Sequence, residues 1–372
     1  MSTLRRLRAL GEKPCRRRLV GDEAVDEAAA HGRGMYWSLT GHAPPRPESA
    51  ENLPPSRHDW PSLTAMVGHF RQAPKGIPRS IRLPYPMVNS HTLQAGESGG
   101  WLGLPADPII IHTPRGRPFG GKQRNLGTEV IDLSGGIDRA RIGERMRLLA
   151  LERPFDRTPA IKSFALFRKL AADQMLSPKV HGAFDLDREP RRTRDSYGDH
   201  ICGTSMLLSR RLIEAGVPIV TVVCAANDLT IPGYDHWDTH GDNFNRLKNI
   251  MLPTFDRAAG ALLDDLADRG LLDETLVVFL TEFGRTPKIN ANAGRDHFPD
   301  CFSVALAGGG IRGGQVYGSS DRSAATPQDL PCGPGDLHAT IFHALGIPPD
   351  TELIDQFGRP QRLCDGEPLP LS

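Results

Sequence analysis

Acidic residues and histidines are concentrated in two short stretches of the chain. Residues 234–243 read Tyr-Asp-His-Trp-Asp-Thr-His-Gly-Asp-Asn, and residues 294–299 read Gly-Arg-Asp-His-Phe-Pro. Between them, residues 275–285 form an apolar run that ends in Thr-Glu-Phe-Gly-Arg. Carboxylates and imidazoles hold divalent cations and transfer protons in proteins, so these stretches predict a metal site or an acid–base site.

Four residues of the two stretches are candidate metal-binding groups. Asp238 and His240 are two positions apart, so an extended chain places both on one side, where they can reach a single cation. Hydrogen bonds that cap a loop are the alternative. His297 is either a metal ligand or a structural histidine bonded to Asp296. Asp296 is a weaker ligand candidate, and it is also placed to fix the tautomer of a ligating imidazole.

Further candidates surround these four. Glu282, at the end of the apolar run, is either a metal ligand or the partner of Arg285 or Arg295 in a salt bridge. Arg285 is a candidate for binding a tetrahedral anion through bidentate hydrogen bonds, and a surface ion pair is the alternative. His236 and Asp235 are weaker metal candidates. The alternatives are that His236 packs beside the neighbouring tryptophan and that Asp235 forms a turn.

The segments around these residues predict an α/β fold. Apolar and β-branched runs of strand length alternate with segments of helical periodicity, which favours a mostly parallel sheet with helices on both faces. The expected helices are 197–215, 243–270 with a kink near Pro253, and 336–345, and the expected strands are 219–224, 276–280 and 302–307. Ligands bind at the carboxyl ends of strands in such sheets, and both acidic stretches follow predicted strands.

The preceding part of the chain fits the same single domain, over residues 1–372. A helix is expected at 60–70, a short strand at 81–84, and further helices at 136–151 and 161–175. Residues 85–130 are rich in glycine and proline, which predicts an irregular excursion from the domain rather than a second domain.

Composition excludes some classes of partner. Forty-five Lys and Arg residues against 44 Asp and Glu leave a net charge of +1, so no overall field attracts nucleic acid. No run of about 18 apolar residues could form a transmembrane helix. The six cysteines show no Cys-x-x-Cys spacing and are interpreted as mainly buried thiols, which leaves the redox compartment open. The sequence makes no prediction of the oligomeric state.

Several stretches closely resemble the domain of unknown function 1501 (DUF1501) family. These are residues 241–248, 271–290, 294–298 and 306–314, and the resemblance spans roughly residues 32–365. It implies membership of the alkaline phosphatase and sulfatase-like superfamily. Members of that superfamily are three-layer α/β/α sandwiches that hydrolyse phosphate or sulfate esters on one or two divalent metals.

The chain departs from the superfamily pattern at two places within the resemblance. Glu-Phe-Gly at 282–284 stands where an Asp-His-Gly metal motif is expected. Counting ten residues back from Gly41, where sulfatases carry a nucleophilic cysteine, leads to His31. His31 is therefore a candidate catalytic residue, as a ligand, a base or a phosphorylated nucleophile, but it is no oxygen nucleophile. The nearby hydroxyls of Ser38 and Thr40 are interpreted as capping or surface groups.

A further departure lies at the amino terminus. Relatives carry an upstream Gly-Gly-Pro-Ser stretch and an aspartate on the first strand, which this chain lacks. The resemblance therefore predicts a chain truncated at its N-terminus, without the usual first strand and one metal-binding aspartate. Many relatives also carry a twin-arginine export signal, which makes the periplasm or cell envelope an expected location.

Two functions follow as hypotheses. The first is a metal-dependent hydrolase of sulfate or phosphate esters, acting on a small-molecule or glycan ester anion. Its divalent metal is expected among Zn, Mn, Fe, Mg and Ca, since the candidate ligands are carboxylates and imidazoles. The alternative is a catalytically degenerate relative that serves as a binding or structural protein of the cell envelope.

Overall fold

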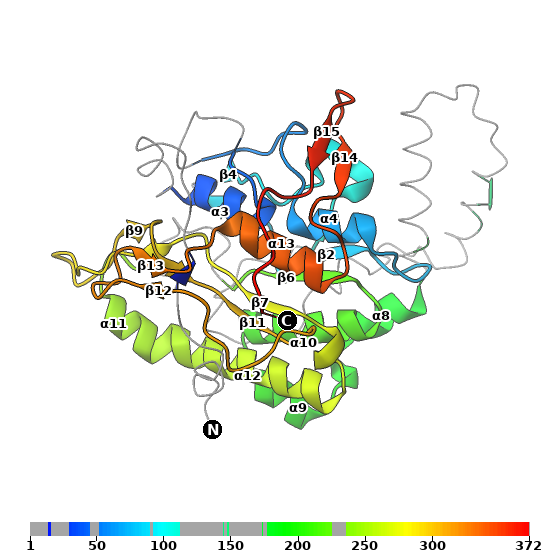
Figure 1. The fold of residues 1–372 in the computed structure, drawn as a ribbon. Coiled ribbons are helices and arrows are strands. Elements are labelled where there is room, and N and C mark those ends of the chain that lie inside the picture. Colours follow the sequence, from blue (N-terminus) through cyan, green and yellow to red (C-terminus); the bar gives the residue numbers. More distant parts are fainter. Residues whose placement is uncertain are drawn as a thin grey trace.

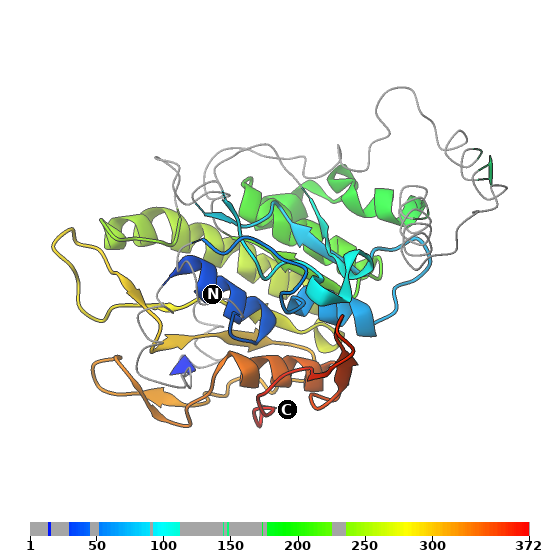
Figure 2. The same cartoon turned by 90° about the horizontal axis from the view of Figure 1, so that it is seen from above.

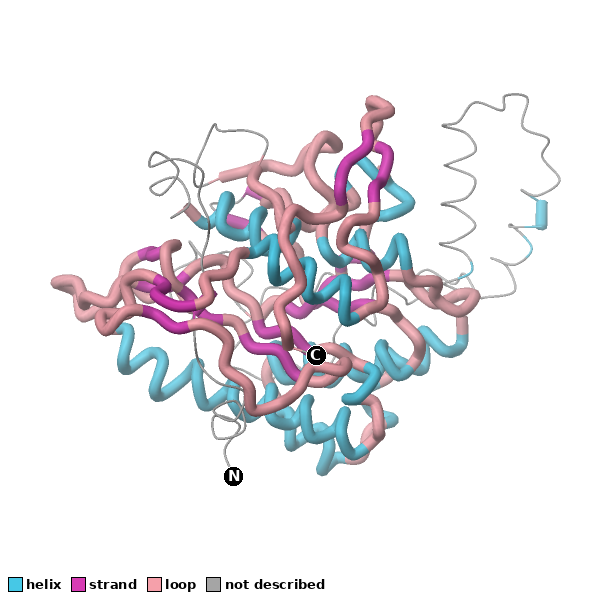
Figure 3. The backbone as a smooth tube through the Cα atoms, viewed as in Figure 1, coloured by secondary structure: helices cyan, strands magenta, loops and turns pink. Residues whose placement is uncertain are grey.

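The described residues form a mixed α/β fold built around a short parallel sheet (Figure 1). The computed structural model describes residues 14–15, 30–44, 52–89, 92–111, 144, 147–148, 173, 177–224 and 236–371. Much of this chain is loop, as Figure 3 shows. Within the described residues, no helix is both long enough and apolar enough to cross a bilayer.

The parallel sheet has β2 (Ser80–Leu83) at its centre, between β5 (Ile109–Ile110) and β6 (Ile219–Val222). Ile81 is opposite Ile109 on one side and Val220 on the other. All four residues of β2 are buried, and the buried charge of Arg82 is paired with Glu97. The predicted strands at 81–84 and 219–224 are confirmed, whereas β5 lies inside the segment predicted to be irregular.

Helices pack on the sheet through two apolar clusters. In Figure 1, α9, α10 and α12 lie below β2 and β6 of the parallel sheet, and α3, α4 and α13 lie above these two strands; Figure 2 gives the view from above. One cluster joins α8, α10 and α12 to Ile81 and Leu83, and the other joins α4 and α13 to Ile219. The helices span Pro178–Phe184 (α8), Arg191–Tyr197 (α9), Ile201–Glu214 (α10), Leu252–Asp268 (α12), His31–Thr40 (α3), Leu63–Phe70 (α4) and Pro334–Ala344 (α13). Helix predictions at 60–70, 197–215 and 336–345 are therefore confirmed, with shifted ends.

The segment predicted as a helix over 243–270 with a kink near Pro253 is interrupted just before that proline. It begins as α11 (Asn243–Arg246), passes through one π-helical turn (Leu247–Met251) and continues as α12. In the π turn, the amide of Leu252 donates to the carbonyl of Leu247, five residues earlier. Pro253 has no amide hydrogen and its ring disfavours a regular α-helical turn before it, which explains the wide turn at this point.

The second half of the chain differs from the predicted parallel arrangement. Strand β7 (Val277–Phe279) pairs with β11 (Ala305–Ala307) in antiparallel orientation. No long helix separates these two strands, so the chain does not make the crossover that parallel neighbours require. Outside the parallel β5–β2–β6 sheet, the other described pairs are also antiparallel: β1 (Pro14–Cys15) with β10 (Phe302–Ser303), β3 (Val88–Asn89) with β4 (Thr92–Leu93), β8 (Gly284–Arg285) with β9 (His297–Phe298), β12 (Ser319–Ser320) with β13 (Pro327–Asp329), and β14 (Glu352–Ile354) with β15 (Pro360–Arg362).

Some predictions are tested only in part. The expected helices at 136–151 and 161–175 lie almost wholly outside the described residues. The described part of the 85–130 excursion contains β3, β4, β5 and short 3₁₀ turns at Gly100–Leu102 and Leu104–Ala106. Further 3₁₀ turns span Leu186–Arg188 and Leu272–Glu274. The interpretation of the cysteines as thiols holds for Cys202, Cys224, Cys301 and Cys364, whereas Cys332 is disulfide-bonded.

Candidate functional site

Helix α3 brings its first residue, His31, against the chain that leaves β7. Gly34, one turn later, allows this approach because a Cβ at that position would lie 2.8 Å from the ring of Phe283 and 3.3 Å from the Cβ of Glu282. A side chain larger than hydrogen would therefore push the helix away. The glycine sets the distance between His31 and the end of β7.

The far end of α3 is held by buried hydrogen bonds. His338 of α13 donates from Nε2 to the carbonyl of Ser38 over 2.8 Å. The hydroxyl of Ser38 donates in turn to the carbonyl of Thr281 over 3.1 Å. The hydroxyl of Thr40 donates to the carbonyl of Tyr36, within the same helix. Ser38 and Thr40 are thus buried structural groups, and α3 is fixed to both α13 and the strand end.

The β8–β9 hairpin brings Arg285 beside His297, because these two residues are opposite each other in its register. Glu282 lies between β7 and β8, so the same short segment of chain carries the acidic and the guanidinium groups to one place. The amide of Thr286 donates to the carbonyl of Asp296 over 2.9 Å, which closes the hairpin next to these side chains.

The loop that carries Asp238 and His240 is tied to the same hairpin. The amide of Arg295 donates to the carbonyl of Thr239 over 3.0 Å, and the Thr239 hydroxyl bonds Asn243 at the start of α11. On the other side, the Trp237 indole donates to the carbonyl of Cys224, beyond the end of β6. These bonds place Asp238 at the edge where the parallel strands end.

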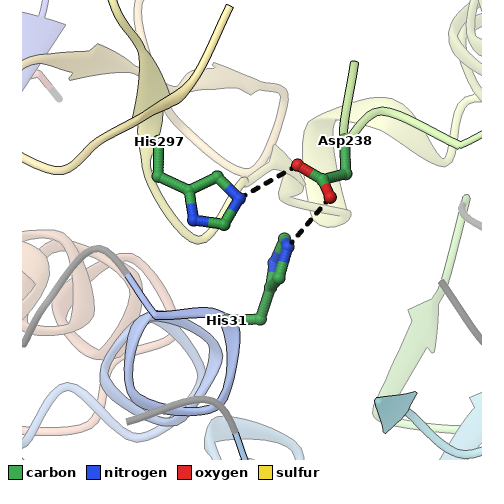
Figure 4. A group of neighbouring side chains, drawn as sticks. All are labelled: His31, Asp238 and His297. Atoms are coloured by element: carbon green, nitrogen blue, oxygen red, sulfur yellow. Dashed lines mark hydrogen bonds and ion pairs between the residues drawn. The ribbon is translucent and has the colours of Figure 1, made fainter. Parts of the chain in front are cut away.

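Three side chains from these separate elements converge on one point (Figure 4). Ligand atoms of His31, Asp238 and His297 all lie within 4.8 Å of one another. The two oxygens of Asp238 face different histidines, with Oδ2 lying 3.3 Å from Nε2 of His31 and Oδ1 lying 3.0 Å from Nε2 of His297. Figure 4 shows both rings directed at the carboxylate. Two imidazoles and a carboxylate are a donor set of the kind that holds zinc and related divalent metals.

His240 extends this group. Its Nε2 lies 2.9 Å from Oδ1 of Asp238 and 3.1 Å from Nε2 of His297. Its Nδ1 lies 2.7 Å from Oδ1 of Asp296, which also accepts from the side chain of Asn290. His240 is about half exposed, so it closes the group on its solvent side.

Carboxylates lie behind two of the three histidines. Glu282 is 3.3 Å from Nδ1 of His31, just as Asp296 is beside Nδ1 of His240. A carboxylate at the outer nitrogen fixes the tautomer of an imidazole whose other nitrogen faces a metal. His31 is buried, and neither of its ring nitrogens has a hydrogen-bond partner of good geometry among the described residues. Nε2 is therefore placed for metal ligation, and Nδ1 is placed for contact with the carboxylate of Glu282.

The site carries excess negative charge. Burial lowers the pKa of His31, but its contacts with Asp238 and Glu282 outweigh burial and raise that pKa to about 9. Burial would raise the pKa of Asp238, yet its bonds with His297 and His31 and the charge of Arg285 hold it well below its usual range. The pKa of Glu282 is lowered by His31 in the same way, against its burial. At neutral pH, His31 therefore carries a proton, and the charges of His31 and Arg285 against the three carboxylates leave one negative charge. Metal ligation requires His31 to release that proton, which leaves two negative charges for one divalent cation to neutralise.

The sequence of the whole chain points to one family. The profile described as "Protein of unknown function (DUF1501)" matches residues 2–371. The chain belongs to the DUF1501 family. No curated protein shows significant similarity to it.

The structure of this DUF1501 protein brings together seven of the nine residues singled out from its sequence: His31, Asp238, His240, Glu282, Arg285, Asp296 and His297. Glu282, predicted as a ligand, contacts the outer nitrogen of His31 instead of the central point. His236 lies in the same loop but outside the converging group, with burial lowering its pKa. Asp235 lies outside the described residues.

Two positioning residues of the DUF1501 site were not identified from sequence. Gly34 has no chemistry of its own, and only its proximity to Phe283 reveals its role. His338, on α13, is fully buried and bonds α3. The spacing of Gly32 and Gly34 in a helix is the one signal that could have indicated a close approach.

Proposed function

We propose that this DUF1501 protein is a metal-dependent hydrolase of sulfate or phosphate esters. The observation that supports the proposal most strongly is the convergence of His31, Asp238 and His297 within 4.8 Å, with a carboxylate at the outer nitrogen of His31. Perturbed titratable groups gathered at the end of a sheet are also typical of active sites.

The proposal includes the three-layer α/β/α sandwich of the alkaline phosphatase and sulfatase-like superfamily. Its support is that helices pack on both sides of the parallel sheet and that the candidate site follows the carboxyl ends of β6 and β7. Ligand sites of open α/β sheets lie at that edge.

The metal would be held by His31, Asp238, His240 and His297, with Glu282 and Asp296 orienting two of the imidazoles. Three imidazoles favour Zn, Mn or Fe over Mg or Ca, which prefer oxygen ligands. A bound divalent ion would lower the pKa of water and stabilise charge on the oxygens of the transferring group.

The protein groups then have distinct roles. His31 is no oxygen nucleophile, and the hydroxyls of Ser38 and Thr40 already bond backbone carbonyls, so water is the proposed attacking group. Arg285 bonds Asp238 through Nη1 over 2.5 Å. A guanidinium has five N–H donors, so the same side chain can also bind the ester anion through its other nitrogens.

One observation favours the alternative, a binding or structural protein of the cell envelope. Asp238 is already contacted by Arg285 and by three imidazoles, so its charge is compensated without any metal. The disulfide bond of Cys332 supports an oxidising location such as the periplasm under either function.

Hydrolysis of p-nitrophenyl sulfate and p-nitrophenyl phosphate by the full chain, supplied in turn with each divalent metal, distinguishes the two functions. The hydrolase proposal predicts turnover that falls at least about a hundredfold in His297→Ala. His343→Ala, which removes an exposed histidine on α13, is the matched control and should leave turnover unchanged. A folded protein that binds metal yet hydrolyses neither ester would favour the binding function instead.

A further inference from the structure

Two cysteines that are not among the candidate ligands face each other where α10 packs on β6. Cys202 is the second residue of α10 and is fully buried, whereas Cys224 follows the end of β6 and is partly exposed. Their sulfur atoms are 2.9 Å apart. A disulfide bond is about 2.04 Å long, so the sulfurs need to approach by only about 0.9 Å to bond.

The fold explains why these residues meet. Helix α10 ends in a turn at Gly216 and the chain then reverses into β6. The start of the helix therefore lies over the end of the strand, and Cys202 belongs to the same apolar cluster that Cys224 packs against. The packing of α10 on β6 therefore brings the two sulfurs to within 2.9 Å of each other.

We propose that Cys202 and Cys224 are a disulfide-forming pair, closed by exchange with a small-molecule disulfide such as oxidised glutathione. The thiolate of Cys224, which is the accessible member, attacks the reagent and releases one glutathione thiolate. The thiolate of Cys202 then attacks Sγ of Cys224 in the mixed disulfide and releases the second. In total, two protein thiols and one glutathione disulfide give one protein disulfide and two glutathione thiols.

This bond would fix a contact that leads to the candidate site. The carbonyl of Cys224 accepts the indole hydrogen bond of Trp237, over 2.5 Å, and Trp237 directly precedes Asp238. A disulfide at Cys224 would fix the end of β6 in place. It would thereby also fix the hydrogen bond from Trp237 that supports the loop carrying Asp238. The contact with Cys224 and burial raise the pKa of Cys202, so the second exchange step should be faster at alkaline pH.

Peptide mapping of the native full chain after incubation with oxidised glutathione tests the proposal. Besides the existing disulfide of Cys332, the expected product is one new peptide pair linked through Cys202 and Cys224, while Cys301 and Cys364 are recovered as alkylated thiols. The new disulfide closes the loop of chain between Cys202 and Cys224, which should raise the melting temperature by roughly 5 °C, and dithiothreitol should reverse the rise. The Cys224→Ser variant should show neither the linked peptides nor that rise.

Two results would overturn the proposal. One is recovery of Cys202 and Cys224 as free thiols, or of Cys224 as a stable glutathione adduct, after excess reagent at pH 8.5 on the folded protein. The other is a linked pair that appears only in denaturant. The mapping uses the unmodified chain, so the test does not depend on whether a cysteine variant folds. Neither result bears on metal binding or ester hydrolysis.

Discussion

The substitution Gly34→Ala tests whether α3 sets the position of His31. The new Cβ would lie 2.8 Å from the Phe283 ring, whereas nonbonded carbons prefer about 3.5 Å or more, so helix and strand end must separate by about 0.7 Å. Metal ligands tolerate deviations of about 0.2 Å, so this shift removes His31 from a site centred on Asp238 and His297. Affinity for Zn²⁺ should then fall at least about tenfold.

Competition with a chromophoric chelator measures this affinity, and circular dichroism checks the fold. Overpacking at Gly34 costs about 1–3 kcal/mol and higher helix propensity returns about 1 kcal/mol, so the variant should remain folded. The control is Gly182→Ala in α8, where a Cβ would meet only the flexible end of Arg188. It should leave affinity unchanged. A folded Gly34→Ala protein whose affinity stays within twofold of the original would refute the positioning argument.

Two further substitutions test the support of the site. Glu282→Gln should weaken Zn²⁺ affinity by about 10–100-fold, because the amide oxygen still accepts from Nδ1 of His31 but lacks the negative charge that makes the imidazole a better ligand. The exposed Glu274→Gln is the control, and equal affinities would contradict this role. Burial lowers the pKa of His338 from 6.5 to about 4. As the pH falls, the unfolded chain therefore binds a proton at this residue before the folded chain does. The contribution of His338 to the free energy of unfolding is lost between about pH 6.5 and about pH 4. That loss amounts to about 3 kcal/mol, so urea unfolding of His338→Gln should depend less on pH in this window than unfolding of the parent chain; identical slopes would contradict the assignment.

Local patterns were sufficient to predict much of the fold. The β-branched run that became β6 and the helical periodicity of α10 and α13 are properties of short segments, so they appear in the sequence directly. Strand β5 was missed because three consecutive isoleucines in a glycine- and proline-rich stretch carry little periodicity. The antiparallel pairing of β7 with β11 depends on the path of the chain between them, which no local pattern specifies.

In the candidate site too, some features are visible in local sequence and others depend on how distant segments pack. The unusual density of acidic residues and histidines near Asp238 and His297 was sufficient to predict a site there. The contact of His31 with Asp238 joins residues 207 positions apart, and it exists only because α3 packs against the strand end beyond β7. Likewise, only distances distinguish Glu282, behind His31, from a residue at the centre of the group.

Elemental analysis of the purified full chain tests the central claim most directly. After incubation with each divalent metal and removal of the excess, the account predicts roughly one tightly held ion per chain. Asp238→Ala should lose that ion, while Asp268→Ala, which removes an exposed aspartate of α12, should keep it. A folded parent chain that retains no divalent metal, or an Asp238→Ala protein that retains as much as the parent, would contradict the account.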